Sequence, residues 1–332
     1  MSRLLLPALW LLALSANAQE PALPLRDRIA LGAFVAGLPY YDSGAREFSA
    51  LERKLGTKIE ILSGFVDWNY VLGNERDLAL TAGGARTLLY SWEPHCAPEA
   101  EGGCITLGEV ARGEHDAYLL RVAASMKAFP HDLYVRPWGE MNAEWSAWQP
   151  GSQRDRAGSV AEFIAAWRHV HTLFREQGVH NLKFVFNPDA SDFDTNTPVP
   201  SIWPGSAYVD VLGIDGYNWG EGTLDRWTEF EDVFAHMYGV LTALHPSAPV
   251  WICEVGVKEP RKNDGSDKRP APIDRAHDKG AWIDAMMSST AFPRVTALVY
   301  FNVLKERDFR FESSPSSLRA IKKQLRQRVR AR

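Results

Sequence analysis

The sequence predicts a single α/β domain folded as a (β/α)8 barrel, and three observations lead to this prediction. Short apolar runs alternate with longer segments of helical periodicity along the chain, as in βα units on a parallel sheet. The apolar runs number eight, which is the number of strands that closes such a barrel. No boundary divides the chain into parts, and barrels of this length are routine single domains.

The N-terminal segment has the pattern of a cleavable signal peptide. Arg3 gives a positive start, Leu4–Leu14 is an apolar run with one proline, and Ala16-Asn17-Ala18 supplies a cleavage site with cutting expected after Ala18. The run is too short for a helix that spans about 30 Å of bilayer. We therefore expect residues 1–18 to be removed and residues 19–332 to form the barrel. The mature protein is then secreted or periplasmic, without a membrane span.

The charge balance gives no indication of a nucleic-acid partner. The chain has 37 Lys and Arg residues against 41 Asp and Glu residues, a net charge of −4. A nucleic-acid-binding domain carries a basic patch or stripe instead. The basic end from Lys322 to Arg332 fits the last turns of a helix, where cations suit the dipole. We expect a monomer.

The expected elements follow one another in βα order. The eight strands are expected at Ile29–Phe34, Lys58–Phe65, Thr87–Trp92, Leu133–Arg136, Leu182–Phe186, Val209–Ile214, Val250–Glu254 and Thr296–Phe301. The helices between them include Glu114–Phe129, Val160–Gln177, Trp227–Leu244, Asp274–Ser289 and Ser314–Arg330. Several of these helices have a Ser, Thr or Asp near the start that can act as an N-cap.

Two irregular segments interrupt this alternation. Asn187–Pro204, rich in Pro and Asp, replaces a clear fifth helix, and Lys258–Pro272 has the composition of a long loop. Both leave the face of the barrel where the strands end, so both are positioned to shape a cleft.

The three cysteines indicate one disulfide and no metal site. Cys96 and Cys104 bracket a short polar loop, and we expect them to pair in an oxidising compartment. Cys253 lies in an apolar strand and is expected to be a buried free thiol. The histidines are scattered, and Asp189, Asp192 and Asp194 do not have the spacing of a calcium loop. We therefore expect neither a metal nor a cofactor.

Two glutamates follow apolar strands in the same way. Glu140 comes just after Leu133–Arg136, and Glu254 closes Val250–Glu254. In a parallel barrel these positions lie on the edge where active sites form. Two carboxyl groups that flank a glycosidic bond are the minimal machinery for hydrolysing it. Other strand ends carry groups that suit sugars: Trp68, Trp92 with Glu93, Asn187, Asp215 with Tyr217, and Asn302 with Lys305.

Several motifs together resemble glycoside hydrolase family 26, a family that includes β-mannanases. The segment from Arg136 to Trp148 is similar to the acid/base motif of the family, and Pro249–Gly256 is similar to its nucleophile strand. Further similarities lie at Ser91–Pro94, Trp203–Asn218 and Phe301–Arg310, so that the resemblance runs over nearly the whole expected barrel. The combination is specific, although each motif alone is weak.

The resemblance implies a role for each matching residue. Glu140 is then the acid/base, Glu254 the nucleophile, and Tyr217 a hydrogen-bond donor to that nucleophile. Trp145 falls at a sugar-stacking position and Arg310 at a substrate contact. The expected substrate-binding set also includes Trp68, Trp92, Arg136, Asn142, Trp219 and Phe301.

Two positions depart from the family pattern near the sugar that is cut. Gly139 stands where the family usually has a histidine, and Phe309 where it usually has a tryptophan. The expected activity is retaining, endo-acting hydrolysis of a β-linked polysaccharide, either β-mannan or a related β-glycan. Two alternatives stay open: a polysaccharide-binding barrel without turnover, and a protein of exopolysaccharide assembly or processing that uses the cleft as a guide.

Overall fold

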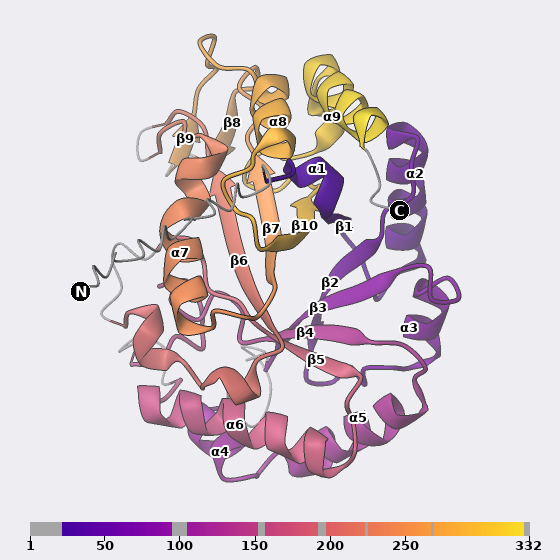
Figure 1. Ribbon diagram of the computed structural model, residues 1–332, viewed down its shortest axis with the longest axis vertical. Coiled ribbons are helices and arrows are strands. Elements are labelled where there is room, and N and C mark those ends of the chain that lie inside the picture. Colours follow the sequence, from indigo (N-terminus) through magenta and orange to yellow (C-terminus); the bar gives the residue numbers. More distant parts are fainter. Residues whose placement is uncertain are drawn as a thin grey trace, which may run out of the picture.

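The computed structural model describes residues 22–94, 105–151, 157–191, 197–222, 225–266 and 269–328, and it contains a closed barrel of eight parallel strands. Around the barrel the order is β1-β10-β7-β6-β5-β4-β3-β2, so each strand lies beside its neighbours in the βα sequence (Figure 1). The predicted (β/α)8 barrel is therefore confirmed. The expected signal peptide and the expected Cys96–Cys104 pair lie outside the described residues.

The barrel strands match the expected apolar runs, with differences of a few residues at their ends. They are β1 (Ala30–Phe34), β2 (Ile61–Asp67), β3 (Thr87–Glu93), β4 (Leu133–Pro137), β5 (Leu182–Phe186), β6 (Val211–Asn218), β7 (Val250–Val257) and β10 (Val295–Phe301). Pairing of Ala30–Phe34 with Ala297–Phe301 closes the ring.

Helices surround the barrel in Figure 1. They are α1 (Leu25–Arg28), α2 (Asp42–Leu55), α3 (Glu75–Leu80), α4 (Leu107–Ala111), α5 (Asp116–Ala128), α6 (Val160–Glu176), α7 (Phe230–Leu244), α8 (Lys279–Ser288) and α9 (Pro315–Gln327). The start of α6 shows how the sequence sets such an element. The Ser159 side chain accepts from the Glu162 amide while Glu162 bonds back to Ser159, a capping box that satisfies two orphan donors.

The two irregular segments contain short elements. After β5 come two short 3-10 helices, η1 (Val199–Ile202) and η2 (Ser206–Tyr208), where the sequence predicted no clear helix. The expected loop at 258–272 was only partly right, because it contains an antiparallel hairpin of β8 (Asp264–Ser266) and β9 (Arg269–Ala271). A three-residue strand has too few positions for a recognisable alternation.

Side chains from the strands fill the inside of the barrel. The interior cluster contains Ile61, Leu89, Val185, Val211, Trp251, Cys253, Ala297 and Val299. Cys253 is buried with a free thiol, as the sequence predicted. Above this cluster, at the carboxyl ends of the strands, an aromatic layer of Phe34, Phe65, Tyr217, Phe301 and Phe309 lines the mouth. The barrel interior is therefore packed with side chains below the mouth.

A β-bulge in β7 turns Glu254 into this mouth. Trp251 and Cys253 both belong to the interior cluster, so strict alternation would point Glu254 outward. The register instead skips one residue of β7 relative to both neighbours, because Ile252 and Glu254 oppose Ile214 and Asp215 of β6. An extra residue of this kind reorients the following side chain. Glu254 consequently faces the same side as Cys253.

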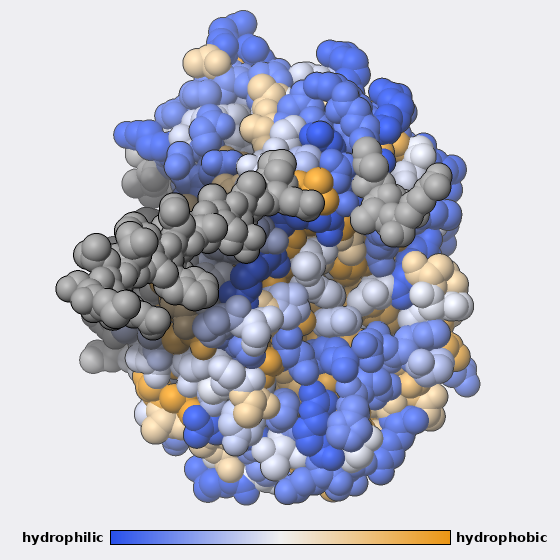
Figure 2. Space-filling view, in the orientation of Figure 1, coloured by the Kyte–Doolittle hydropathy of each residue, from blue (hydrophilic) through white to orange (hydrophobic). Residues whose placement is uncertain are grey.

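The surface of the described part is ordinary for a globular domain. On the face shown in Figure 2, hydrophilic side chains cover the helices at both ends and hydrophobic ones form scattered patches. Among the described residues, no helix combines the length and the apolar character needed to cross a membrane.

Two glycines give opposite expectations for substitution by alanine. A Cβ on Gly213 of β6 would lie 2.2 Å from Asn187 Oδ1 and 2.9 Å from Asn187 Cβ, whereas a Cβ on Gly239 of α7 meets nothing within 4 Å. Gly213→Ala should lower the free energy of unfolding by about 1–3 kcal/mol through overpacking. Gly239→Ala should raise it by up to about 1 kcal/mol through helix propensity. Urea unfolding measures both, and equal effects would contradict the close packing of Asn187 on β6.

Candidate active site

Glu140 lies on a tight turn that follows β4. Trp138 and Glu140 both have positive φ angles, 52° and 55°, a conformation that costs a non-glycine residue free energy. The Glu140 amide donates to the Asn187 carbonyl at 2.8 Å, which ties the turn to the end of β5. The Trp138 ring is buried against Trp68, Phe163 and Trp167. These contacts hold the strained turn and direct Glu140 toward the barrel axis.

Arg136 is the cation at the centre of the site. Its side chain is 1% exposed, and its guanidinium donates to Asp215 Oδ2 and to Glu254 Oε1, each at 2.6 Å. It also donates to the Ser91 hydroxyl of β3. A planar guanidinium can make several such bonds at fixed angles, which a lysine ammonium cannot. Arg136 therefore fixes carboxylates of β6 and β7 from the end of β4.

Glu254 has a second anchor on its other oxygen. The Tyr217 hydroxyl donates a hydrogen bond to Glu254 Oε2. Burial and the nearby Glu254 charge raise the pKa of Tyr217 well above its ordinary value, so the hydroxyl keeps its proton and remains a donor. With Arg136 on one oxygen and Tyr217 on the other, Glu254 is oriented and its negative charge is stabilised.

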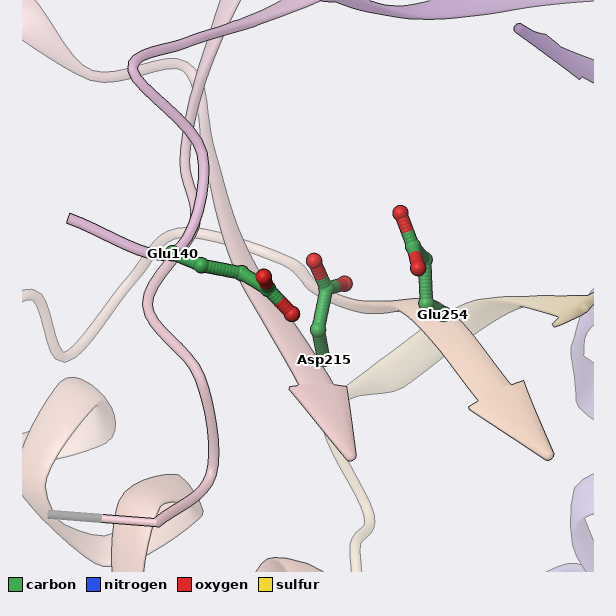
Figure 3. A group of neighbouring side chains, drawn as sticks. All are labelled: Glu140, Asp215 and Glu254. Carbon is green, nitrogen blue, oxygen red and sulfur yellow. The ribbon is translucent and has the colours of Figure 1, made fainter. Parts of the chain in front are cut away.

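Three carboxyl groups meet in the mouth. Oxygens of Glu140, Asp215 and Glu254 all lie within 4.8 Å of one another, and Figure 3 shows Asp215 between the two glutamates. A set of three carboxylates at this spacing has the donor atoms to hold a cation, and the Arg136 guanidinium already provides a positive charge to two of them. Asp215 was noted in the sequence only as a polar strand end. Its inward position on β6, two residues before Tyr217, was the signal available.

The environments of the carboxyl groups differ strongly. Burial, followed by the charges of Glu254 and Asp189, raises the pKa of Glu140 to about 8. Glu140 is therefore largely protonated at neutral pH. Burial raises the pKa of Asp215 well above its ordinary value, with Arg136 opposing this shift. A protonated Glu140 beside a Glu254 that is held by two donors is the asymmetry that acid/base chemistry requires.

Trp145 is the most accessible of the expected sugar-binding residues. Its side chain is 66% exposed, and its indole Nε1–H donates to Glu140 Oε2 at 2.7 Å. The neighbouring Trp148 donates to the Gly139 carbonyl at 2.7 Å. The loop after β4 thus presents one aromatic face to solvent and uses its polar edge to orient Glu140.

Several other expected substrate contacts are corrected by their burial. Trp92 and Asn142 have no exposed surface, so neither can touch a sugar. Trp92 donates to the Tyr118 hydroxyl, and Asn142 bonds the backbone of Asp189 on the neighbouring loop. Trp68 is 5% exposed and packs outside the barrel strands against Trp92 and Tyr118. Phe301 stacks on Phe34 in the aromatic layer of the mouth, so its expected contact stays a prediction. Arg136 is bonded to Glu254 and Asp215 and is almost fully buried, so it orients Glu254 and does not contact the substrate itself. The sequence could place these residues at strand ends but could not show their depth.

The remaining expected contacts keep partly exposed side chains near the mouth. Trp219 packs on Tyr217 and Phe309, and Arg310 forms a two-pronged pair with the buried Asp308, with both N–O distances at 2.8 Å. Phe309 is buried under Tyr217. A Cβ placed on Gly139 would meet only the Arg136 Cβ, at 4.0 Å, so the space above this residue is open.

The barrel and its two facing glutamates have the arrangement that glycoside hydrolysis requires, and comparisons with known proteins show what the chain resembles. The model of Glycosyl hydrolase family 26 matches residues 117–255, which include both Glu140 and Glu254. Endoglucanase H of Acetivibrio thermocellus is 30% identical over 300 residues, or 89% of this chain. Mannan endo-1,4-beta-mannosidase of Bacillus subtilis is 30% identical over 158 residues, or 46% of this chain. By this match the segment that holds both glutamates belongs to glycoside hydrolase family 26.

The relatives extend beyond the matched part. The chain spans 30% of the length of the endoglucanase and 38% of that of the mannosidase. A solved structure, the catalytic domain of the Bacillus sp. JAMB-750 endo-beta-1,4-mannanase, superposes with a TM-score of 0.63 over 90% of this chain and 86% of the other. At 18% identity this likeness supports the shared barrel fold alone.

The pKa of Glu140 should depend on Glu254. Because the Glu254 charge helps to keep Glu140 protonated, Glu254→Gln should move the Glu140 titration from about pH 8 toward the ordinary range of glutamate. NMR of protein labelled with ¹³C at the glutamate carboxyl carbons measures this, with Glu140→Gln assigning the signal. The exposed Glu144→Gln is the matched control and should leave the titration unchanged. A Glu140 titration near pH 4 in the unaltered protein would contradict the site described.

Proposed function

We propose that this protein is an endo-acting glycoside hydrolase that cleaves a β-linked polysaccharide with retention of configuration. The observation that carries the proposal is the pair of Glu140 and Glu254, with oxygens within 4.8 Å and opposite environments. Retaining glycosidases place the two carboxyl groups about 5–5.5 Å apart, so that the second one reaches the sugar directly. An inverting pair, at about 6.5–9.5 Å, leaves room for a water instead.

In the first step Glu254 acts as the nucleophile. One carboxylate oxygen forms a bond to the anomeric carbon while the bond from that carbon to the leaving oxygen breaks. Glu140 gives its proton to the leaving oxygen, which departs as a hydroxyl group of the shortened chain. Arg136 and Tyr217 hold Glu254 in the attacking orientation. The Trp145 indole holds Glu140 by the oxygen Oε2.

In the second step Glu140, now a carboxylate, acts as the base. It takes a proton from water, the water oxygen bonds to the anomeric carbon, and the bond to Glu254 breaks with its electron pair returning to the carboxylate. Arg136 and Tyr217 stabilise the returning charge because both are donors to Glu254. Two displacements at one carbon retain its configuration.

The names of the relatives support a proposal for the substrate class. The two relatives carry the names endoglucanase and mannan endo-1,4-beta-mannosidase, which favours β-linked glucan or mannan. The family usually has a histidine where this chain has Gly139, and a Cβ at that position would meet no atom closer than 4.0 Å. A panel of mannan, glucomannan, mixed-linkage glucan, β-1,3-xylan and bacterial exopolysaccharides tests the choice. Oligosaccharides should appear early, and monosaccharide alone would contradict endo action.

The two glutamates should differ when azide is added. Glu140→Ala lacks the acid, but an activated aryl glycoside needs no proton, so the glycosyl-enzyme should form and accumulate. Azide should then attack it and give the β-glycosyl azide. Glu254→Ala cannot form this intermediate, so its activity should fall by several orders of magnitude and azide should give the α-product.

NMR of the azide products distinguishes the two assignments. If Glu140→Ala gave the α-azide and Glu254→Ala the β-azide, Glu140 would be the nucleophile and Glu254 the acid/base. Wild-type hydrolysis of the natural polysaccharide by Glu140→Ala would overturn the proposed mechanism, and absence of hydrolysis by the unaltered protein on every glycan would favour a binding role.

A further inference from the structure

Glu93 is a titratable group at the mouth to which the proposed reaction assigns no part. It is the last residue of β3, and its side chain is partly exposed. On this strand Leu89 belongs to the barrel interior and the Ser91 hydroxyl accepts from Arg136. Because side chains alternate along a strand, Glu93 faces the same inner side, one step closer to the opening. It therefore lies above the layer that contains Arg136 and Glu254.

Asp67 of β2 lies beside it in the same layer. Asp67 and Glu93 are register partners in the β2–β3 pair, and Ile61 and Phe65 on β2 place Asp67 on the inner face by the same alternation. The Asp67 amide donates to the Tyr40 hydroxyl at 3.2 Å, and Tyr40 is an exposed aromatic residue of the loop after β1. Two carboxyl groups and an exposed aromatic ring are thus adjacent on this rim. Such groups accept hydrogen bonds from sugar hydroxyls and cover the apolar face of a sugar ring.

The strand order places Glu93 and Asp67 on the part of the rim that continues through β1 to β10, whereas the Glu140 turn is tied to the end of β5. Burial raises the pKa of Glu93 to about 7, Arg136 and Lys305 oppose this, and Glu254 and Asp67 add to it. In the part of the chain that the structure describes, the Glu93 carboxyl forms no hydrogen bond or ion pair. Because Glu93 is partly exposed and faces the mouth, both of its carboxyl oxygens can accept hydrogen bonds from a ligand.

The direction of the reaction then identifies the sugar. Glu140 protonates the leaving oxygen, so the leaving chain lies on the side of Glu140 and Trp145. The sugar attacked by Glu254 lies on the other side, where Asp67 and Glu93 are. We propose that Glu93, with Asp67 beside it, binds hydroxyl groups of a neutral hexopyranose on the glycone side of the bond that is cut. This inference rests on the proposed function, and it makes Glu93 a specificity-determining residue of that reaction.

A substrate without any leaving-side sugar isolates this subsite. The 2,4-dinitrophenyl β-trioside of glucose or mannose has only glycone sugars and a leaving group that needs no acid. At pH 8, above the pKa of Glu93, Glu93→Gln keeps the shape but loses the charge, and it should lower kcat/KM on this substrate about ten- to hundredfold, since a hydrogen bond to a charged acceptor is lost. Glu144→Gln, an exposed carboxyl on the Trp145 loop, is the matched control and should stay within twofold of the unaltered protein.

A binding measurement separates this proposal from the proposed function. Calorimetry with cellohexaose and mannohexaose should show about tenfold or greater weakening in Glu93→Gln even if no hydrolysis occurs. Thermal unfolding should be unchanged, because Glu93 has no hydrogen-bond partner to lose. Labelling of Glu254 by a 2-deoxy-2-fluoro glycoside, together with unaltered kinetics and binding in Glu93→Gln, would overturn the subsite alone. Failure of both hexasaccharides to bind the unaltered protein would overturn it as well.

Discussion

The buried pairing of Arg136 with Glu254 and Asp215 is the interaction on which the rest of the mouth depends. Taking a carboxylate out of water is unfavourable unless a cation and hydrogen-bond donors compensate for the lost hydration. Arg136 supplies that compensation to β6 and β7 from β4, while Ser91 ties it to β3. One side chain therefore sets the relative positions of four strands at the point where chemistry is expected. Removing it would leave two carboxyl groups buried without their cation.

The β7 bulge and the turn at Glu140 each direct one glutamate side chain into the mouth of the barrel. Glu254 would face the helices if its strand alternated regularly, and one extra residue turns it into the mouth. Glu140 reaches the mouth through positive φ angles at residues 138 and 140, which the buried Trp138 ring and the tie to β5 hold in place. Local irregularity is thus concentrated where two carboxyl groups must approach each other, in keeping with strain being stored at functional sites.

Electrostatic asymmetry is the second consequence of this arrangement. Glu254 receives both strong donors, Arg136 and Tyr217, whereas Glu140 has one indole N–H and feels the charge of Glu254. Two glutamates a few ångströms apart consequently differ: Glu140 holds a proton, and Glu254 is bonded to a cation and a hydroxyl donor. Glu93 extends the pattern toward the rim, where partial exposure leaves a carboxyl group accessible to a ligand. The mouth therefore has the ion-paired Glu254 at its base and the accessible carboxyl group of Glu93 at its edge.

The sequence by itself determined the barrel, the positions of its eight strands and the two glutamates, because apolar periodicity and strand-end chemistry are local properties of the chain. Depth and direction were decided only by the tertiary structure. Trp92 lies at the end of β3 and Asn142 follows β4 as Trp145 does, yet neighbouring helices and loops cover both residues completely. Asp215 becomes part of the site only because Arg136 and the β7 bulge bring three carboxyl groups together. These outcomes depend on contacts between residues far apart in the chain, and no local pattern records them.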